Sequence, residues 1–157
     1  MVTTEHGEAF ELTPNYWGAV VVSGLLAGVL MGVLMHQVMG IMQAVGALYT
    51  LETTSSGWVF HLIHATVFAV VFGGFFMWDR LAALHDRVLP SAALGIAWGV
   101  ALWLVAAGVV MPLWLAAVGA PSPGVPTWDP WSGIGHVLYG TVLGGGSAMA
   151  HRYLSPG

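Results

Sequence analysis

Histidine is the residue type in this sequence whose placement could do chemistry. Seven histidines occur, and four of them lie within long apolar stretches or beside their ends: His36, His61, His64 and His136. Neutral imidazole is a common ligand for zinc, copper and iron. Ionisable side chains inside apolar membrane segments are costly, so they usually face the protein interior and mark function. These four histidines are therefore the candidate site.

Metal or haem ligation is the first use that would suit them. A pair of histidines on two facing helices, here His61 and His136, could hold the iron of a haem b, with His36 and His64 in support. A transition metal is the alternative. Thioether and imidazole together suit copper, and Met35 and Met111 are the candidate thioether ligands. We prefer haem b to a bare metal.

Two other uses stay open. A histidine could donate a hydrogen bond to a quinone carbonyl between Trp and Tyr side chains, or the histidines could only hydrogen-bond across neighbouring helices. A zinc hydrolase is not expected, because it needs a carboxylate base near its metal and the long apolar stretches contain no Asp or Glu. We therefore expect a non-catalytic subunit.

The composition indicates that lipid surrounds the chain. Of its 157 residues 57% are hydrophobic and only 6% are charged, whereas a soluble domain carries about a quarter charged residues. Cysteine is absent, which excludes disulfides and thiolate metal sites. The net charge of −4 argues against nucleic acid as a partner.

Four apolar stretches are long enough to cross a bilayer, which takes roughly 20 residues. They run over about residues 16–48, 58–78, 91–118 and 131–153, after an acidic tail at residues 1–15. The predicted fold is an all-α integral membrane four-helix bundle over residues 16–157. The first stretch exceeds what a bilayer requires, so it would tilt or project beyond the membrane.

Four spans place both termini and the middle loop on one side, and all three arginines fall there: Arg80, Arg87 and Arg152. The positive-inside rule then predicts a multi-pass protein of the cell membrane with cytoplasmic N- and C-termini. His6, His85 and His151 lie on that side and are expected in solvent. The outer side has no Arg or Lys to pair with haem propionates, which counts against haem.

The chain also repeats itself at about half its length. The segment Gly57 to Val67 aligns with Ser132 to Val142, which places His61 opposite His136. This similarity predicts two pseudo-symmetric helical hairpins related by an axis along the membrane normal. His61 and His136 should then face each other across that axis. Counting along the spans places all four candidate histidines in one layer of the outer half of the membrane.

Glycines at every fourth position predict close helix packing. They recur at Gly24, Gly28 and Gly32, at Gly95 and Gly99, and at Gly140 and Gly144. Small residues at this spacing allow helix backbones to approach each other in lipid. The alternative is that some of them make room for a flat cofactor.

Four segments carry a resemblance: Met35 to Gly40 (MHQVMG), Gly57 to Phe68 (GWVFHLIHATVF), Val105 to Gly119 (VAAGVVMPLWLAAVG) and Gly135 to Gly144 (GHVLYGTVLG). On these segments, which sample all four spans, the sequence resembles a group of small four-span membrane proteins of haloarchaea. The resemblance implies the fold and the host, and it supplies no activity.

The sequence as a whole predicts a small membrane subunit or partner of a respiratory redox complex, in which the histidine layer binds haem b, a metal or quinone. Its partners would be the lipid bilayer and either other membrane subunits or further copies of itself. The alternative is a cofactor-free accessory or assembly protein that stabilises a larger complex. A small transporter is less favoured, because no Arg or carboxylate is expected inside the membrane, Arg152 lying at the cytoplasmic end of its span.

Overall fold

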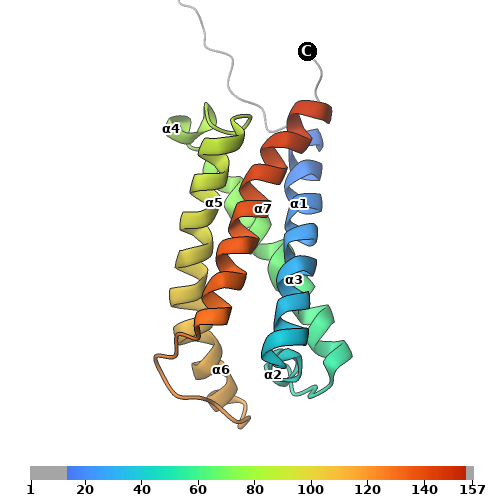
Figure 1. The fold of residues 1–157 in the computed structure, drawn as a ribbon, viewed down its shortest axis with the longest axis vertical. Coiled ribbons are helices and arrows are strands. Elements are labelled where there is room, and N and C mark those ends of the chain that lie inside the picture. Colours follow the sequence, from blue (N-terminus) through green and yellow to red (C-terminus); the bar gives the residue numbers. More distant parts are fainter. Residues whose placement is uncertain (1–13, 155–157) are drawn as a thin grey trace, which may run out of the picture.

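The computed structural model describes residues 14–154, which form helices joined by short loops and contain no strand (Figure 1). The predicted acidic tail, residues 1–15, lies outside the described residues except for its last two positions. The helices follow in the order α1 (Pro14–Leu34), η1 (Met35–Met39), α2 (Met42–Ala47), α3 (Thr54–Gly74), η2 (Phe75–Met77), α4 (Asp79–Ala82), α5 (Val88–Leu102), η3 (Trp103–Val110), α6 (Met111–Ala117) and α7 (Pro130–Leu154). Both η1 and η3 are π-helical turns that continue an α-helix without interruption.

Three helical segments are long and apolar enough to cross a membrane: Pro14–Met39, Thr54–Met77 and Val88–Ala117. The prediction of an all-α fold with helices suited to crossing a membrane is confirmed at this level. The fourth predicted span corresponds to α7, which has 25 residues but is less apolar because of its glycines, serines and histidines. This helix lies between α1 and α5 and packs against both (Figure 1), so much of its surface contacts protein.

The first predicted span is shorter than the sequence suggested. We expected one helix to continue to Leu48, but it ends at Met39, and Gly40 adopts a left-handed conformation with φ of 65°. Glycine reaches that conformation without steric cost. The chain then turns back as α2, which packs against the start of α3. A side chain at Gly57 would collide with the backbone of Met42, so this approach requires glycine.

The glycine pattern serves helix packing, as predicted. On α1, a side chain at Gly24 or Gly28 would collide with an alanine of α3. On α5, a side chain at Gly95 or Gly99 would collide with backbone carbonyl groups of α7. Two pairs of helices, α1 with α3 and α5 with α7, are therefore close because small residues line both contacts.

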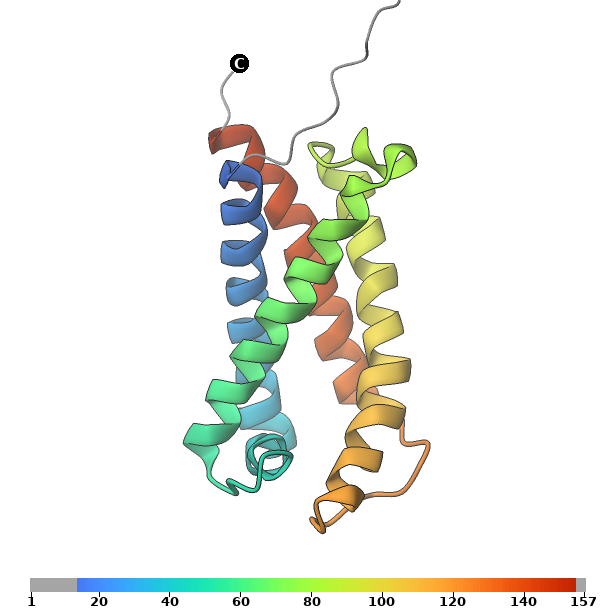
Figure 2. The same cartoon turned by 180° about the vertical axis from the view of Figure 1, so that it is seen from behind.

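The helices α3 and α5 are held apart by aromatic side chains. Trp98 of α5 stands between Phe68 of α3 and Phe75 of η2, with ring centroids 6.4 and 5.1 Å away. Figure 2 shows that α3 runs obliquely, close to α5 near α4 and away from it toward α2 and α6. The chain forms two helical hairpins, α1 with α3 and α5 with α7. The unequal spacing of α3 and α5 leaves room between these hairpins at the end that contains α2 and α6.

The loop after α6 returns along the third long segment. Pro112 has no N–H to donate within the helix, and the carbonyl of Gly108, four residues earlier, accepts from the backbone N–H of Thr127 at 2.9 Å. The indole N–H of Trp128 donates to the carbonyl of Leu104 at 3.2 Å. These bonds hold the proline-rich loop against η3 and keep backbone carbonyls of a π-helical turn satisfied.

The two ends of the molecule differ in charge. Helix α4, the start of α1 and the end of α7 lie at one end, and α2 and α6 lie at the other (Figure 1). Arg80, Arg87 and Arg152 all belong to the first, which we call the arginine end. The opposite end, with α2, α6 and the loop at residues 118–129, is called the α2–α6 end.

Candidate functional site

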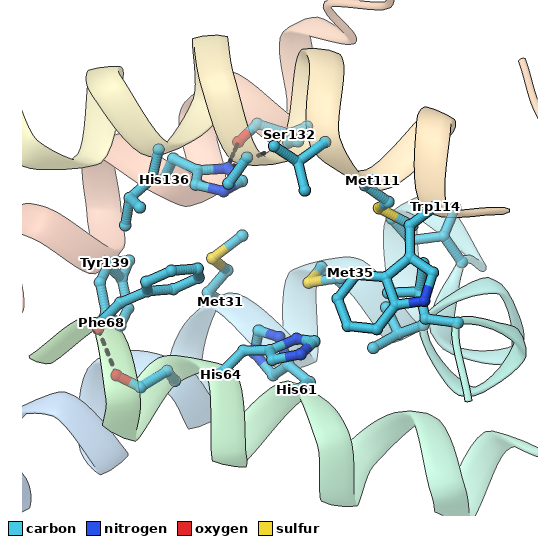
Figure 3. Close-up of a pocket in the computed structure, with 18 residues that line it drawn as sticks. Met31, Met35, His61, His64, Phe68, Met111, Trp114, Ser132, His136 and Tyr139 are labelled. Atoms are coloured by element: carbon cyan, nitrogen blue, oxygen red, sulfur yellow. Dashed lines mark hydrogen bonds between the residues drawn. The ribbon is translucent and has the colours of Figure 1, made fainter. Parts of the chain in front are cut away.

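A cavity of about 200 Å³ lies between the two hairpins, toward the α2–α6 end (Figure 3). Helices α1, α3, α5 and α7 all contribute to it, together with η1, α2, η3 and α6. Its lining combines three histidines, three methionines, aromatic rings, aliphatic side chains and one serine: Met31, Met35, Ile41, Val45, Leu48, His61, His64, Ala65, Phe68, Leu102, Ala106, Ala107, Val110, Met111, Trp114, Ser132, His136 and Tyr139. The cavity brings together five of the six candidate site residues from the sequence.

His61 is fixed on one wall by α3. This helix begins with a reciprocal cap, in which the side chains of Thr53 and Ser56 each accept from the other's backbone N–H. His61 lies on the buried face that Gly57 and Ala65 share at four-residue spacing. Its Nε2–H donates to the backbone carbonyl of Gly28 at 2.8 Å. Because a carbonyl only accepts, Nδ1 of the neutral ring carries the lone pair.

His136 is fixed on the opposite wall by α7. Its Nδ1–H donates to the backbone carbonyl of Ser132, one turn earlier, at 2.8 Å. In the neutral ring Nε2 then carries the lone pair. Figure 3 shows His136 across the cavity from His61 and His64. Both rings are buried, at 9% and 6% exposure for His136 and His61, and both line the cavity.

His64 also lines the cavity but is held by a side chain. Its Nε2 lies 2.7 Å from the hydroxyl of Tyr49, which follows α2. The Tyr49 ring stacks on Phe60, with centroids 3.8 Å apart. The fold-back of the chain after Gly40 therefore places Tyr49 beside His64. The sequence analysis did not predict this contact, because it expected the first span to continue to Leu48.

Three thioethers face the same space. Met31 and Met35 come from the first long segment and lie between the histidine walls, and Met111 comes from the first turn of α6 (Figure 3). Met35 and Met111 were predicted site residues, whereas Met31 was missed. Its four-residue spacing from Met35 was the available signal, because residues at that spacing share a helix face.

His36 does not join the site. It lies in η1, is exposed, and does not line the cavity. Its ring lies 6.1 Å from the ring of Trp58. His36 directly follows Met35, which lines the cavity, but one residue along a helix rotates a side chain by about 100°. Since Met35 faces inward, its neighbour His36 faces away. The expectation that all four histidines form one inward layer is corrected to three.

Two histidines expected in solvent lie together at the arginine end. The rings of His85 and His151 have centroids 4.9 Å apart, and the ring of Tyr16 lies 5.8 Å from that of His151. The short helix α4 and the turn after it bring His85 back over the end of α7. No pattern in the sequence indicates this pair, because the approach of the two rings depends on how the middle loop folds.

The donor set at the cavity limits its chemistry. Among residues 14–154, no three His, Cys, Asp or Glu side chains come close enough to hold a metal ion together. An ion in the cavity would need thioether ligands besides imidazole. The hydrogen bonds from His61 and His136 to backbone carbonyls fix each ring and its tautomer, which is the usual outer-shell arrangement of ligating histidines.

Comparisons with known proteins add no precedent. The chain matches no protein-family model, no curated protein and no solved structure. Its function has to follow from the geometry of its own cavity.

Proposed function

We propose that the chain is a four-helix membrane bundle of two pseudo-symmetric hairpins, with its arginine end in the cytoplasm. In support, α7 has 25 residues and would extend about 37 Å, more than the ~30 Å of a hydrocarbon core. The first segment of each hairpin contains a π-helical stretch, η1 or η3. The grouping of all three arginines at one end agrees with the positive-inside rule.

We further propose that the cavity binds a copper(I) ion through His61 and His136, with thioether ligands from the methionines. The observation that carries this proposal is the pairing of tautomers. Each of the two rings has one N–H committed to a backbone carbonyl, at 2.8 Å in both cases. The other nitrogen of each neutral ring is a lone-pair donor, and both rings line the same cavity.

The ligand chemistry favours copper(I) over zinc. Thioethers are soft ligands that select copper(I), whereas zinc is usually completed by thiolate or carboxylate. The chain has no cysteine, and no Asp or Glu lines the cavity. Met31, Met35 and Met111 are the side chains that could complete the coordination.

The size of the cavity and the tautomers disfavour the other two expected ligands. Pockets for drug-sized ligands hold roughly 300–1,000 Å³, and a haem is larger than most such ligands. The cavity of about 200 Å³ lies below that range, which favours an ion over a haem. A quinone carbonyl needs a hydrogen-bond donor, but the N–H groups of His61 and His136 already donate to backbone carbonyls.

On this proposal the chain is a small subunit or partner that holds copper for a membrane redox complex. Burying charge in the membrane interior is costly, so a monovalent ion is less costly to bury there than a divalent ion. A monovalent ion can therefore be held without charged ligands. Imidazole and thioether are both neutral, so the bound site carries only the charge of the ion.

The test is an anaerobic copper(I) titration of the protein purified in detergent, in competition with a chromophoric chelator. We expect one equivalent to bind. His61→Ala and His136→Ala should each weaken affinity by more than about 100-fold, beyond the effect typical of an outer-shell partner. His36→Ala is the matched control and should bind as the wild type does, because His36 lies outside the cavity.

Thermal unfolding of each variant separates loss of the site from loss of the fold. A wild-type protein without stoichiometric copper(I) would refute the proposal, and the cofactor-free accessory role would then be favoured. Equal loss of affinity in His36→Ala and His61→Ala would refute the assignment of ligands. A Soret band in material purified from its native host would show that haem occupies the cavity instead.

A further inference from the structure

A second, wider hollow of about 530 Å³ lies at the α2–α6 end, and we call it the vestibule. Four residues line both the vestibule and the cavity: Ile41, Ala107, Met111 and Ser132. The two spaces are therefore neighbours that share one wall. Met39 and Asp129 line the vestibule but not the cavity.

We infer that the vestibule is the entry route of the metal, and that Met39 and Met111 pass a soft monovalent cation inward to the cavity. This inference rests on the proposed copper site and adds the side from which the ion arrives. With the arginine end in the cytoplasm, the ion would enter from the outer face.

The methionines form a series of increasing burial. Met39, at the vestibule, and Met111, in the shared wall, are both half-buried. Met35 and Met31, which line the cavity, are buried at 6% and 7% exposure. Met31, Met35 and Met39 follow one another at four-residue spacing, which corresponds to steps of about 6 Å along a helix.

These methionines would lower the energetic cost of moving a cation from water to the cavity. A bare cation that leaves water for an apolar space loses its hydration at a large cost. A soft ion can instead exchange one ligand at a time, gaining an inner thioether as it releases an outer one or a water. Each intermediate position then keeps donor atoms around the ion, and no charged group has to accompany it.

Asp129 supplies the first attraction. It is exposed, and its Oδ1 accepts from the backbone N–H of Ser132 at 2.9 Å, which fixes the carboxylate at the start of α7. A fixed negative charge at a mouth raises the local concentration of cations and their rate of association.

The opposite end does not offer such a route. Between the cavity and the arginine end lie the fully buried rings of Tyr16, Phe72 and Phe76, each at 2% exposure or less. Within the described part of the chain, these packed rings leave no open path from the arginine end, so packing directs entry to the vestibule.

The experiment measures copper(I) loading by stopped flow, together with equilibrium affinity, for single Met→Leu variants. Leucine keeps a similar volume and removes the thioether. Met39→Leu should slow loading about tenfold and leave the affinity near that of the wild type, since it acts on the route and not on the site. Met35→Leu should instead weaken the affinity. Met77→Leu is the matched control, because Met77 is exposed at the arginine end, and it should change neither quantity.

The outcomes distinguish this inference from the copper site itself. Normal copper(I) binding with wild-type loading rates in Met39→Leu would overturn the entry route and leave the site standing. A parallel loss of rate and affinity in Met39→Leu would make Met39 a ligand of the site and would also overturn the route. A wild-type protein that binds no copper(I) would overturn both proposals.

Discussion

The close contact between Gly99 of α5 and the backbone of His136 of α7 links helix packing to the candidate site. The substitution Gly99→Ala, which adds one methyl group, tests this link. A Cβ at Gly99 would lie 2.9 Å from the backbone carbonyl carbon of His136 and closer still to its oxygen. Ordinary Cβ contacts begin at 3.4 Å. Because the obstacle is backbone, Gly99→Ala must push α5 and α7 apart locally by about 1 Å in an interior with little free volume.

The expected energy follows from two opposing effects. Overpacking of this kind costs about 3 kcal/mol, whereas alanine gains about 1 kcal/mol over glycine in a helix. Gly99→Ala should therefore lower the free energy of unfolding by about 2 kcal/mol. Copper(I) affinity should fall as well, by about tenfold, because ligands must be held to within about 0.5 Å and His136 would move with its backbone.

Gly145→Ala on α7 is the control. A Cβ there would meet Ala92 at 3.6 Å, an ordinary contact, so the helix gain of up to about 1 kcal/mol remains. Equilibrium unfolding in mixed micelles with increasing dodecyl sulfate measures both variants. If Gly99→Ala proved as stable as Gly145→Ala and bound copper(I) equally well, the close approach of α5 and α7 would not position His136.

Two other substitutions test the fold-back after the first span. Tyr49→Phe removes the hydroxyl that contacts His64 at 2.7 Å but keeps the ring stacked on Phe60. It should lower stability by about 1 kcal/mol and leave copper(I) affinity unchanged, and an unchanged melting temperature would contradict the assigned contact. Gly40→Ala meets no neighbouring atom within 4 Å but must adopt φ near 65°. It should therefore lower stability by about 1–2 kcal/mol through strain alone, and a gain in stability on thermal unfolding would show that the turn is not left-handed.

Much of the fold could be predicted because long apolar helices follow simple rules of length and of packing through small residues. The lengths of the apolar stretches predicted the long helices. The last three predicted spans correspond to α3, to the segment from α5 to α6, and to α7, and each observed end lies within four residues of the predicted one. Small residues at four-residue spacing gave the close contacts, which the positions of Gly24 and Gly95 confirm. Gly40 was the exception. The helices contain many glycines, so the sequence does not indicate that Gly40 in particular adopts a left-handed conformation and ends its helix.

The site was predictable in depth but not in direction. His61, His64 and His136 share a cavity, as the sequence suggested, since counting along spans gives the level of each residue. The direction in which His36 points depends on helix rotation, which the apolar pattern leaves undetermined when a segment is hydrophobic on all sides. Tyr49 joined the site through the fold-back of the chain, so no periodic pattern could have identified it.

The aromatic side chains between α3 and α5 have a consequence for any neighbour in the membrane. Trp98 separates α3 from α5, whereas α1 and α7 pack closely. His61 and His136, on the two walls of the cavity, belong to α3 and α7. The third long segment has the least protein cover of the three candidate spans, with 22% of its apolar window buried. If the proposed copper site exists, a protein or lipid that packs on this segment would change the gap between His61 and His136, and would thereby change the affinity for the ion without contacting it.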